Sequence, residues 1–132
     1  MPDTQTKKKT VLLVDDDQFL LSMYSLKFKN SGFEVETINS TSGALQKLHD
    51  GFAPDVILCD LVMPAISGLE FIKRMKEEKL SPSSAIVVLT NQSQSSEIDM
   101  ARELGVDGFI VKSSTIPSEV VEEVKAILSK KR

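Results

Sequence analysis

The chain has 132 residues, a formal net charge of −3 and a single cysteine. One cysteine excludes a secreted module built on internal disulfides, and the near-average composition argues against disordered and fibrous classes. The slightly acidic balance argues against binding nucleic acid through bulk charge, and no apolar run is long enough to span a membrane. We expect a cytoplasmic protein with one domain at residues 10–129, a disordered tail at 1–9 and a frayed end at 130–132.

Five short segments are expected to be strands, and four of them are apolar without interruption. Segments that are apolar on both faces are typical of a parallel sheet covered by helices on each side. The second segment alternates between polar and apolar residues, as expected for an edge strand with one exposed face. In chain order the segments are residues 11–14, 33–38, 56–59, 85–89 and 108–111.

Segments with helical periodicity separate these strands. Serine, threonine and aspartate stand at several expected starts, and glycine follows several expected ends. Strand and helix alternate five times, which predicts a doubly wound α/β sandwich with right-handed crossovers. The expected helices cover residues 17–30, 41–50, 67–78, 95–104 and, beginning at Pro117, the last segment of the chain.

Polar residues follow four of the five expected strands. In parallel α/β sheets, ligands bind beyond the carboxyl ends of the strands, so these residues are expected to meet at one edge of the sheet. They are Asp15, Asp16 and Asp17 after the first strand, Asp60 after the third, Thr90 after the fourth and Lys112 after the fifth. Asp17 is interpreted as the cap of the following helix.

These residue types have the chemistry that forms an aspartyl phosphate. Oxygen ligands without histidine or cysteine favour a hard cation such as Mg²⁺. Mg²⁺ held by Asp16 and Asp60 could neutralise a phosphoryl donor while one carboxylate oxygen remains the nucleophile. Lys112 and Thr90 would then pair with the transferred phosphoryl oxygens.

Four motifs at the ends of four expected strands resemble one known family. Each motif is weak alone, but together and in this order they are similar to the receiver domain of two-component response regulators. The resemblance covers about residues 10–129 and implies a flavodoxin-like fold with five parallel strands in the order 2-1-3-4-5. The motifs are Val14-Asp15-Asp16-Asp17, Asp60-Leu61-Val62-Met63-Pro64-Ala65-Ile66-Ser67-Gly68-Leu69, Leu89-Thr90 and Phe109-Ile110-Val111-Lys112.

The resemblance implies a role for each acidic residue of the site. Asp60 matches the phosphoacceptor, and Asp15 and Asp16 match the acidic pair that holds Mg²⁺. Asp16 would be a direct ligand, whereas Asp15 would act largely through metal-bound water. The backbone carbonyl of Val62 matches the third protein ligand, a role that does not depend on its side chain.

The resemblance also implies a switch behind the phosphoacceptor. Thr90 and Phe109 match a coupled pair, in which the hydroxyl closes on the phosphoryl group and the aromatic ring turns inward behind it. Lys112 matches the lysine that binds the phosphoryl group. From the residues alone, Phe109 fits plain core packing equally well.

Three positions depart from the usual pattern of the family. Ser113 stands where a proline with a cis peptide bond is common in the family. A cis bond before a residue other than proline is costly, so the bond between Lys112 and Ser113 could be trans, or the loop could have a different shape. Asn91 stands where a smaller residue is commoner, which would narrow the approach to the phosphoacceptor. Val62 and Gln92 flank the expected path of the hydrolytic water, and we expect slow dephosphorylation because Val62 cannot hydrogen-bond to that water.

We therefore expect a single-domain response regulator in a two-component phosphorelay. A sensor histidine kinase or a histidine phosphotransfer protein would donate the phosphoryl group to Asp60 with Mg²⁺ as the cofactor. Phosphorylation would switch a protein-interaction surface on the fourth helix, last strand and last helix. Because nothing follows residue 132, we expect the output to be a protein contact by a monomer or a phosphorylation-dependent dimer, without nucleic-acid binding or membrane insertion.

Two other functions remain open on the sequence. The first is a receiver-like interaction module that works without phosphorylation, which the residues Asn91 and Ser113 favour. The second is an aspartyl-phosphate phosphatase with Asp15 as its nucleophile, although such enzymes need a further acidic pair that the sequence lacks. As a response regulator the protein is not expected to be an enzyme, although it would support its own phosphotransfer and autodephosphorylation.

Overall fold

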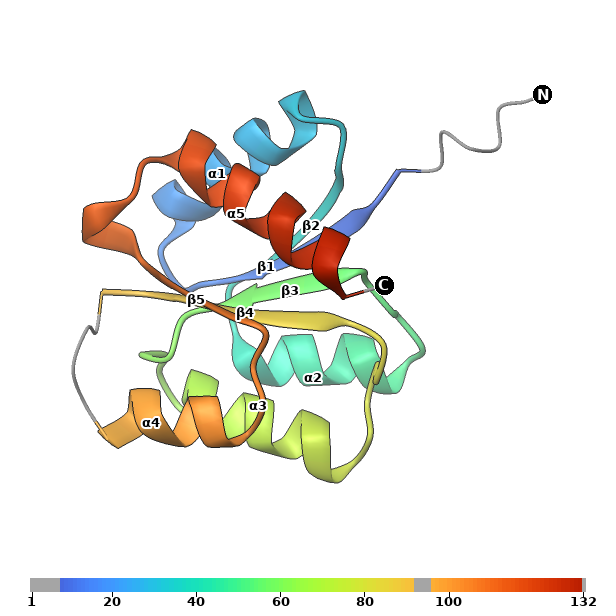
Figure 1. Cartoon of the computed structure of the whole chain (residues 1–132). Coiled ribbons are helices and arrows are strands. Elements are labelled where there is room, and N and C mark those ends of the chain that lie inside the picture. The colour runs from blue at the N-terminus through green and yellow to red at the C-terminus, as the bar shows by residue number, and fades with distance from the viewer. Residues whose placement is uncertain (1–7, 92–95, 132) are drawn as a thin grey trace.

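Five strands and five α-helices alternate along the described part of the chain in the computed structural model (Figure 1). The structure describes residues 8–91 and 96–131, so most of the expected N-terminal tail and the last residue lie outside it. The strands are β1 (Thr10–Val14), β2 (Glu34–Ile38), β3 (Val56–Cys59), β4 (Ala85–Thr90) and β5 (Gly108–Val111). All five expected strands are confirmed, with bounds that differ by one residue at most.

The helices begin close to the expected capping residues. Asp17, Ser40 and Ser67 each accept a hydrogen bond at a helix start, from the backbone N–H groups of Leu20, Gly43 and Glu70 respectively. The helices are α1 (Gln18–Asn30), α2 (Thr41–His49), α3 (Gly68–Glu77), α4 (Ser96–Glu103) and α5 (Pro117–Lys130). Ser95, the first residue of the expected fourth helix, lies outside the described residues. Within residues 8–91 and 96–131, every helix is too short or too polar to cross a membrane.

All strands of the sheet are parallel, in the order β2-β1-β3-β4-β5. Helices α1 and α5 cover one face, and α2, α3 and α4 cover the other (Figure 1). This is the flavodoxin-like α/β fold that the resemblance implies. The strand order reverses between β1 and β3, and their carboxyl ends form the edge where this type of fold binds ligands.

The uninterrupted apolar strands are explained by two hydrophobic clusters, one on each face of the sheet. Leu12 and Val14 of β1 pack with residues of α2, α3 and α4, whereas Val11 and Leu13 pack with residues of α1 and α5. Consecutive side chains of a strand point to opposite faces, so a central strand needs apolar residues at every position. The sheet is thereby buried on both sides up to the point where its polar carboxyl ends begin.

The edge position of β2 is also confirmed, although its exposure differs from the expected single wet face. Val35 packs against the cluster beneath α1 and α5, and Ile38 packs against the cluster on the other face. Glu36, between them, is exposed and lies 3.3 Å from the ammonium group of Lys47. Both faces of this strand are therefore partly covered because α1 and α2 flank it.

A strained residue lies in the loop between β3 and α3, where Ala65 has a φ angle of 65°. This left-handed conformation costs an L-residue about 1–2 kcal/mol, but glycine adopts it freely. We expect Ala65→Gly to raise the free energy of unfolding by about 0.5–1 kcal/mol after the entropy cost of glycine. The measurement is urea denaturation followed by circular dichroism.

The control is the same substitution at Ala126, an exposed residue of helix α5. Ala126→Gly should lower the free energy of unfolding by about 1 kcal/mol, because glycine disfavours a helix interior. Equal destabilisation by both variants would show that Ala65 is not strained.

Candidate functional site

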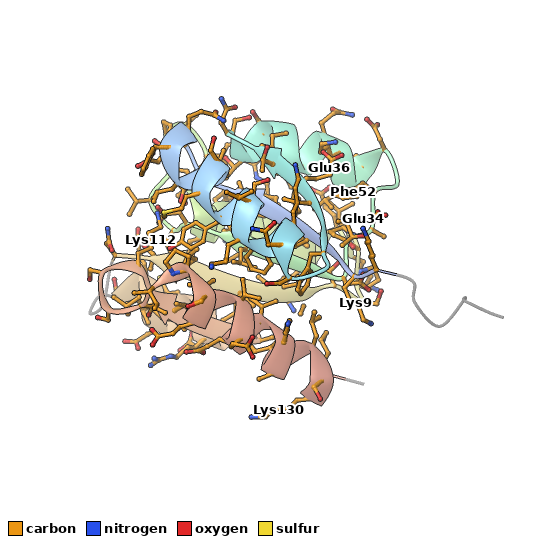
Figure 2. The ribbon with its side chains drawn as sticks, turned by 90° about the horizontal axis from the view of Figure 1, so that it is seen from above. Lys9, Glu34, Glu36, Phe52, Lys112 and Lys130 are labelled. Carbon is orange, nitrogen blue, oxygen red and sulfur yellow. The ribbon has the colours of Figure 1, made fainter. Side chains whose placement is uncertain are left out.

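A cavity of about 360 Å³ lies at the carboxyl ends of β1, β3, β4 and β5. It is lined by six of the residues expected at the site, Asp15, Asp16, Asp60, Val62, Thr90 and Lys112. These residues come from four separate strands or the loops after them, so the parallel sheet brings them together. Figure 2 shows Lys112 at the end of the molecule opposite to Lys9.

Lys112 holds two carboxylates of the cavity at once. Its Nζ lies 2.6 Å from Asp15 Oδ2 and 2.9 Å from Asp60 Oδ2. All three side chains are close to nine-tenths buried, with exposed fractions of 9%, 10% and 11%. Buried charges need partners and hydrogen bonds to offset their lost hydration, and here one ammonium group serves both acids. The other oxygen of Asp60, Oδ1, accepts a hydrogen bond from the Val62 N–H at 3.1 Å.

Burial and hydrogen bonding shift the pKa values of Asp15 and Lys112. Desolvation raises the pKa of Asp15, outweighing its hydrogen bonds from Lys112 and from the Asp17 N–H group. Burial lowers the pKa of Lys112, but the hydrogen bonds to Asp15 and Asp60 outweigh it, so that this pKa is raised overall. Lys112 is therefore firmly charged at neutral pH, whereas the ionised form of Asp15 is costly. More positive charge at this edge would relieve that cost.

The donor set suits a hard divalent cation. Asp16 is exposed on the cavity wall, and the described residues give its carboxylate no ion-pair partner. In the described part of the chain, no three acidic, histidine or cysteine side chains are grouped closely enough to hold a metal, and Lys112 lies against Asp15 and Asp60. Asp15, Asp16 and Asp60 nevertheless line one cavity together with a single ammonium group, so the cavity has the oxygen donors and the excess negative charge that Mg²⁺ prefers.

Gly68 fixes the loop that carries Val62, and the sequence analysis did not single it out as a positioning residue. Its N–H donates to the Leu61 carbonyl at 3.0 Å. A Cβ atom at this position would lie 1.9 Å from the backbone oxygen of Asp60. Only glycine permits this approach of α3 to the end of β3. The signal was a glycine in the first turn of an expected helix, where other residues are commoner.

Thr41 fixes the same loop from another element. Its side chain is buried, and Oγ1 donates to the Ile66 carbonyl at 2.5 Å. The sequence indicated only that serine or threonine stands at the start of this helix, where Ser40 makes the capping hydrogen bond. Nothing in the local sequence links a residue of α2 to a carbonyl 25 positions later. The bond holds the loop that presents the Val62 backbone to the cavity.

Thr90 and Phe109 lie on the same face of the sheet. Val88 pairs with Phe109 in the register of β4 and β5, and Thr90 lies two residues beyond Val88. Thr90 is buried and lines the cavity, whereas Phe109 packs half-buried against the cluster beneath α4. The guanidinium of Arg102 lies 5.7 Å from the centre of the Phe109 ring. The shared face agrees with a coupled pair, and the switch role of Phe109 stays a prediction.

The connection after Lys112 has a trans peptide bond, one of the two alternatives to the family's cis bond that the sequence allowed. The described residues contain no cis peptide bond, so the bond between Lys112 and Ser113 is trans. A 3₁₀ turn, Lys112–Ser114, follows β5 directly. Asn91 lines the cavity as well, while Gln92, expected beside the water path, lies outside the described residues.

Comparison with known families identifies the class of protein. The family model described as the response regulator receiver domain matches residues 11–125. The chain belongs to this family. Its members are phosphoacceptor signalling domains of two-component systems that typically bind Mg²⁺, and the family implies a histidine kinase as partner.

Two similar curated proteins are transcriptional regulators. The phosphate regulon regulator PhoB of Pseudomonas aeruginosa is 32% identical over 120 residues, which cover 91% of this chain and 52% of PhoB. The alkaline phosphatase synthesis regulator PhoP of Bacillus subtilis is also 32% identical, and the match covers 91% of this chain and 48% of PhoP. The chain therefore spans about half the length of these relatives.

Solved structures give matches over nearly the whole chain. The chemotaxis protein CheY4 of Vibrio cholerae is 27% identical with a TM-score of 0.82, covering 92% of this chain and 99% of CheY4. The beryllofluoride-activated receiver domain of Thermotoga maritima DrrB is 26% identical with a TM-score of 0.79, covering 93% and 99%. A CheY-like receiver protein of Methanospirillum hungatei, 23% identical with a TM-score of 0.86 and coverage of 95% and 97%, shows the shared fold.

The single tyrosine of the chain reports the charge of the site. Burial raises the pKa of Tyr24 above its ordinary value of 10.0, while the charge of Lys112 lowers it and that of Asp15 raises it. We therefore expect Lys112→Met to move this pKa further up and Asp15→Asn to move it down. Because folded Tyr24 holds its proton more tightly, the free energy of unfolding should also fall as the pH rises above 10.0.

The measurement is the ultraviolet absorbance of tyrosinate against pH, with circular dichroism showing that each variant stays folded. Lys47→Gln is the control, because Lys47 lies on α2, on the other face of the sheet from Tyr24. A rise of this pKa in Lys47→Gln as large as the rise in Lys112→Met would mean that Tyr24 responds to net charge and not to the site.

Proposed function

We propose that the chain is a single-domain response regulator that accepts a phosphoryl group on Asp60. The observation that carries the proposal is the buried ammonium of Lys112, 2.6 Å from Asp15 and 2.9 Å from Asp60 inside one cavity. A lysine already poised beside the acceptor can pair with a transferred phosphoryl group without a large rearrangement. The proposed domain covers residues 10–129. We propose that the domain acts without a fused output domain because the match with CheY4 covers almost all of CheY4.

In the proposed reaction, an oxygen of Asp60 attacks the phosphorus of a phosphohistidine. The new O–P bond forms as the P–N bond breaks, and the imidazole leaves. Asp15, Asp16, Asp60 and the Val62 carbonyl would hold Mg²⁺, which when bound neutralises the charge of the phosphoryl oxygens. The Val62 N–H fixes Asp60 Oδ1 during the approach.

The switch proposed for this site begins at the same phosphoryl group. The hydroxyl of Thr90, on the cavity wall, would close on a phosphoryl oxygen, and Phe109 on the same face would follow it inward. The movement would change the surface of α4, β5 and α5, which would then bind a protein partner. Met100, half-exposed on α4, supplies an apolar contact on that surface.

The first test is to map the site of phosphorylation. The protein is incubated with acetyl phosphate in the presence of Mg²⁺. We expect one phosphoryl group at Asp60, located by mass spectrometry after borohydride reduction, and none in Asp60→Asn. An adduct at Asp15 would instead support a phosphatase, and no adduct at either residue would support a module that works without phosphorylation. Omission of Mg²⁺ should abolish the reaction.

Three exposed apolar side chains are close in sequence to residues of the cavity. Phe19 at the start of α1, Val62 after β3 and Ile116 before α5 are 75%, 53% and 59% exposed. Each follows a residue of the site by four positions or fewer. Exposed apolar groups around a charged centre are typical of a protein-docking surface. A donor protein with an apolar surface around its phosphohistidine would fit such a surface.

The second test separates docking from chemistry. The donor is a histidine phosphotransfer protein that phosphorylates the wild type. We expect Phe19→Ala to slow phosphotransfer from this donor about tenfold, as for a central interface residue. The rate with acetyl phosphate should stay unchanged, because Phe19 does not line the cavity. Leu26→Ala, on the same helix and 62% exposed, is the matched control. Equal slowing with both donors would place the effect in the reaction itself.

A further inference from the structure

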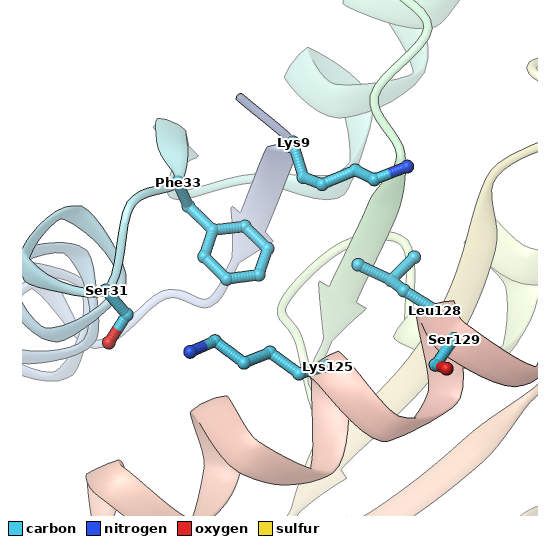
Figure 3. A pocket seen from close by; sticks show the side chains of 6 residues that line it. All are labelled: Lys9, Ser31, Phe33, Lys125, Leu128 and Ser129. Atoms are coloured by element: carbon cyan, nitrogen blue, oxygen red, sulfur yellow. The ribbon is translucent and has the colours of Figure 1, made fainter. Parts of the chain in front are cut away.

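A second cavity, of about 580 Å³, lies at the amino edge of the sheet (Figure 3). It is lined by Lys9, Ser31, Phe33, Lys125, Leu128 and Ser129. Lys9 precedes β1 and Asp15 follows it, so this strand, about 17 Å long, separates the two cavities. None of the lining residues belongs to the phosphoacceptor site.

The walls of this cavity are held by the fold. Phe33 is only 6% exposed, and its ring packs edge-on against Phe28 with centroids 5.0 Å apart. The Glu34 N–H donates to the Lys9 carbonyl at 2.8 Å, which fixes the backbone of Lys9. The opposite wall is one face of α5, where lining residues recur at helical spacing. The apolar part of the cavity is therefore preformed.

The charged groups of the cavity are both positive. Two ammonium groups line it and no carboxylate does. Lys9 has no ion pair within residues 8–91 and 96–131, and Lys125 reaches only the exposed Glu122, at 3.8 Å. An exposed pair at that distance is weak. Figure 3 shows the Phe33 ring projecting between the side chains of Lys9 and Lys125, with Leu128 across from it.

We propose that this cavity binds a small organic anion with a flat apolar body, such as an aromatic carboxylate. Phe33 and Leu128 contact the body from two sides, and the ammonium group of Lys125 pairs with the anionic group, while Lys9 adds positive charge on the other side of the Phe33 ring (Figure 3). The serine hydroxyls at 31 and 129 supply further hydrogen bonds. The volume and the mixture of apolar walls with a few polar groups are those of small-molecule sites.

The probe for the test is naphthalene-2-carboxylate, titrated into the ¹⁵N-labelled full chain and followed by NMR. We expect saturable shifts of the backbone amides of Ser31, Phe33 and Leu128, with a Kd of about 1 mM or lower for a ligand of this size. Naphthalene-2-methanol lacks the charge and acetate lacks the apolar body, so each should bind at least about fivefold more weakly. Shifts that do not saturate, or that centre elsewhere, overturn the proposal.

Matched variants of α5 test the role of charge. Lys125→Gln should weaken binding of naphthalene-2-carboxylate about fivefold, whereas Lys130→Gln should leave it within about twofold. Both variants remove one exposed lysine from the same helix, and only Lys125 lines the cavity. Equal weakening in the two variants would mean unspecific attraction by net charge and would overturn the proposal. The unliganded spectrum of each variant shows that it is folded.

Discussion

The ammonium of Lys112 is the interaction on which the site depends, because it joins the ends of three strands. Asp15 follows β1, Asp60 follows β3 and Lys112 follows β5, with β4 between the last two. Neighbouring strands lie about 4.8 Å apart, so the carboxylates and the lysine backbone are separated by a gap that only a long side chain crosses. The three charges are buried, and the two carboxylates are tolerated because the ammonium of Lys112 is present between them. The ammonium of Lys112 thus sets both the positions of the two carboxylates and the charge balance of the site.

Much of the fold could be predicted because its signals are local. The strand at 56–59 is apolar at every position, which only a sheet covered on both faces requires, and Ser67 caps the next helix as expected. The candidate site could be predicted for the same reason, since each polar residue directly follows an apolar strand. A parallel sheet then brings these residues to one edge without further information.

The remaining features depend on contacts between distant segments. Thr41 and Ile66 meet only because α2 and α3 pack side by side, and the approach of Gly68 to the Asp60 backbone depends on the path of a whole loop. Periodicity reports which face of an element is buried, but not which carbonyl a buried hydroxyl will reach. The sequence likewise predicted Lys112 and several aspartates at one edge, but not that one ammonium would contact both Asp15 and Asp60.

The two proposed sites follow from one topological fact. In a doubly wound sheet every helix runs against the strands, so helix N-termini gather at the carboxyl edge and C-termini at the amino edge. Helix dipoles favour acids at the first edge and bases at the second. Here a basic residue stands in the last turn of all five described helices: Lys29, Lys47, Lys76, Arg102 and Lys130. Within a net charge of −3, the cavity at the carboxyl edge has carboxylates that favour a cation, and the cavity at the amino edge has ammonium groups that favour an anion.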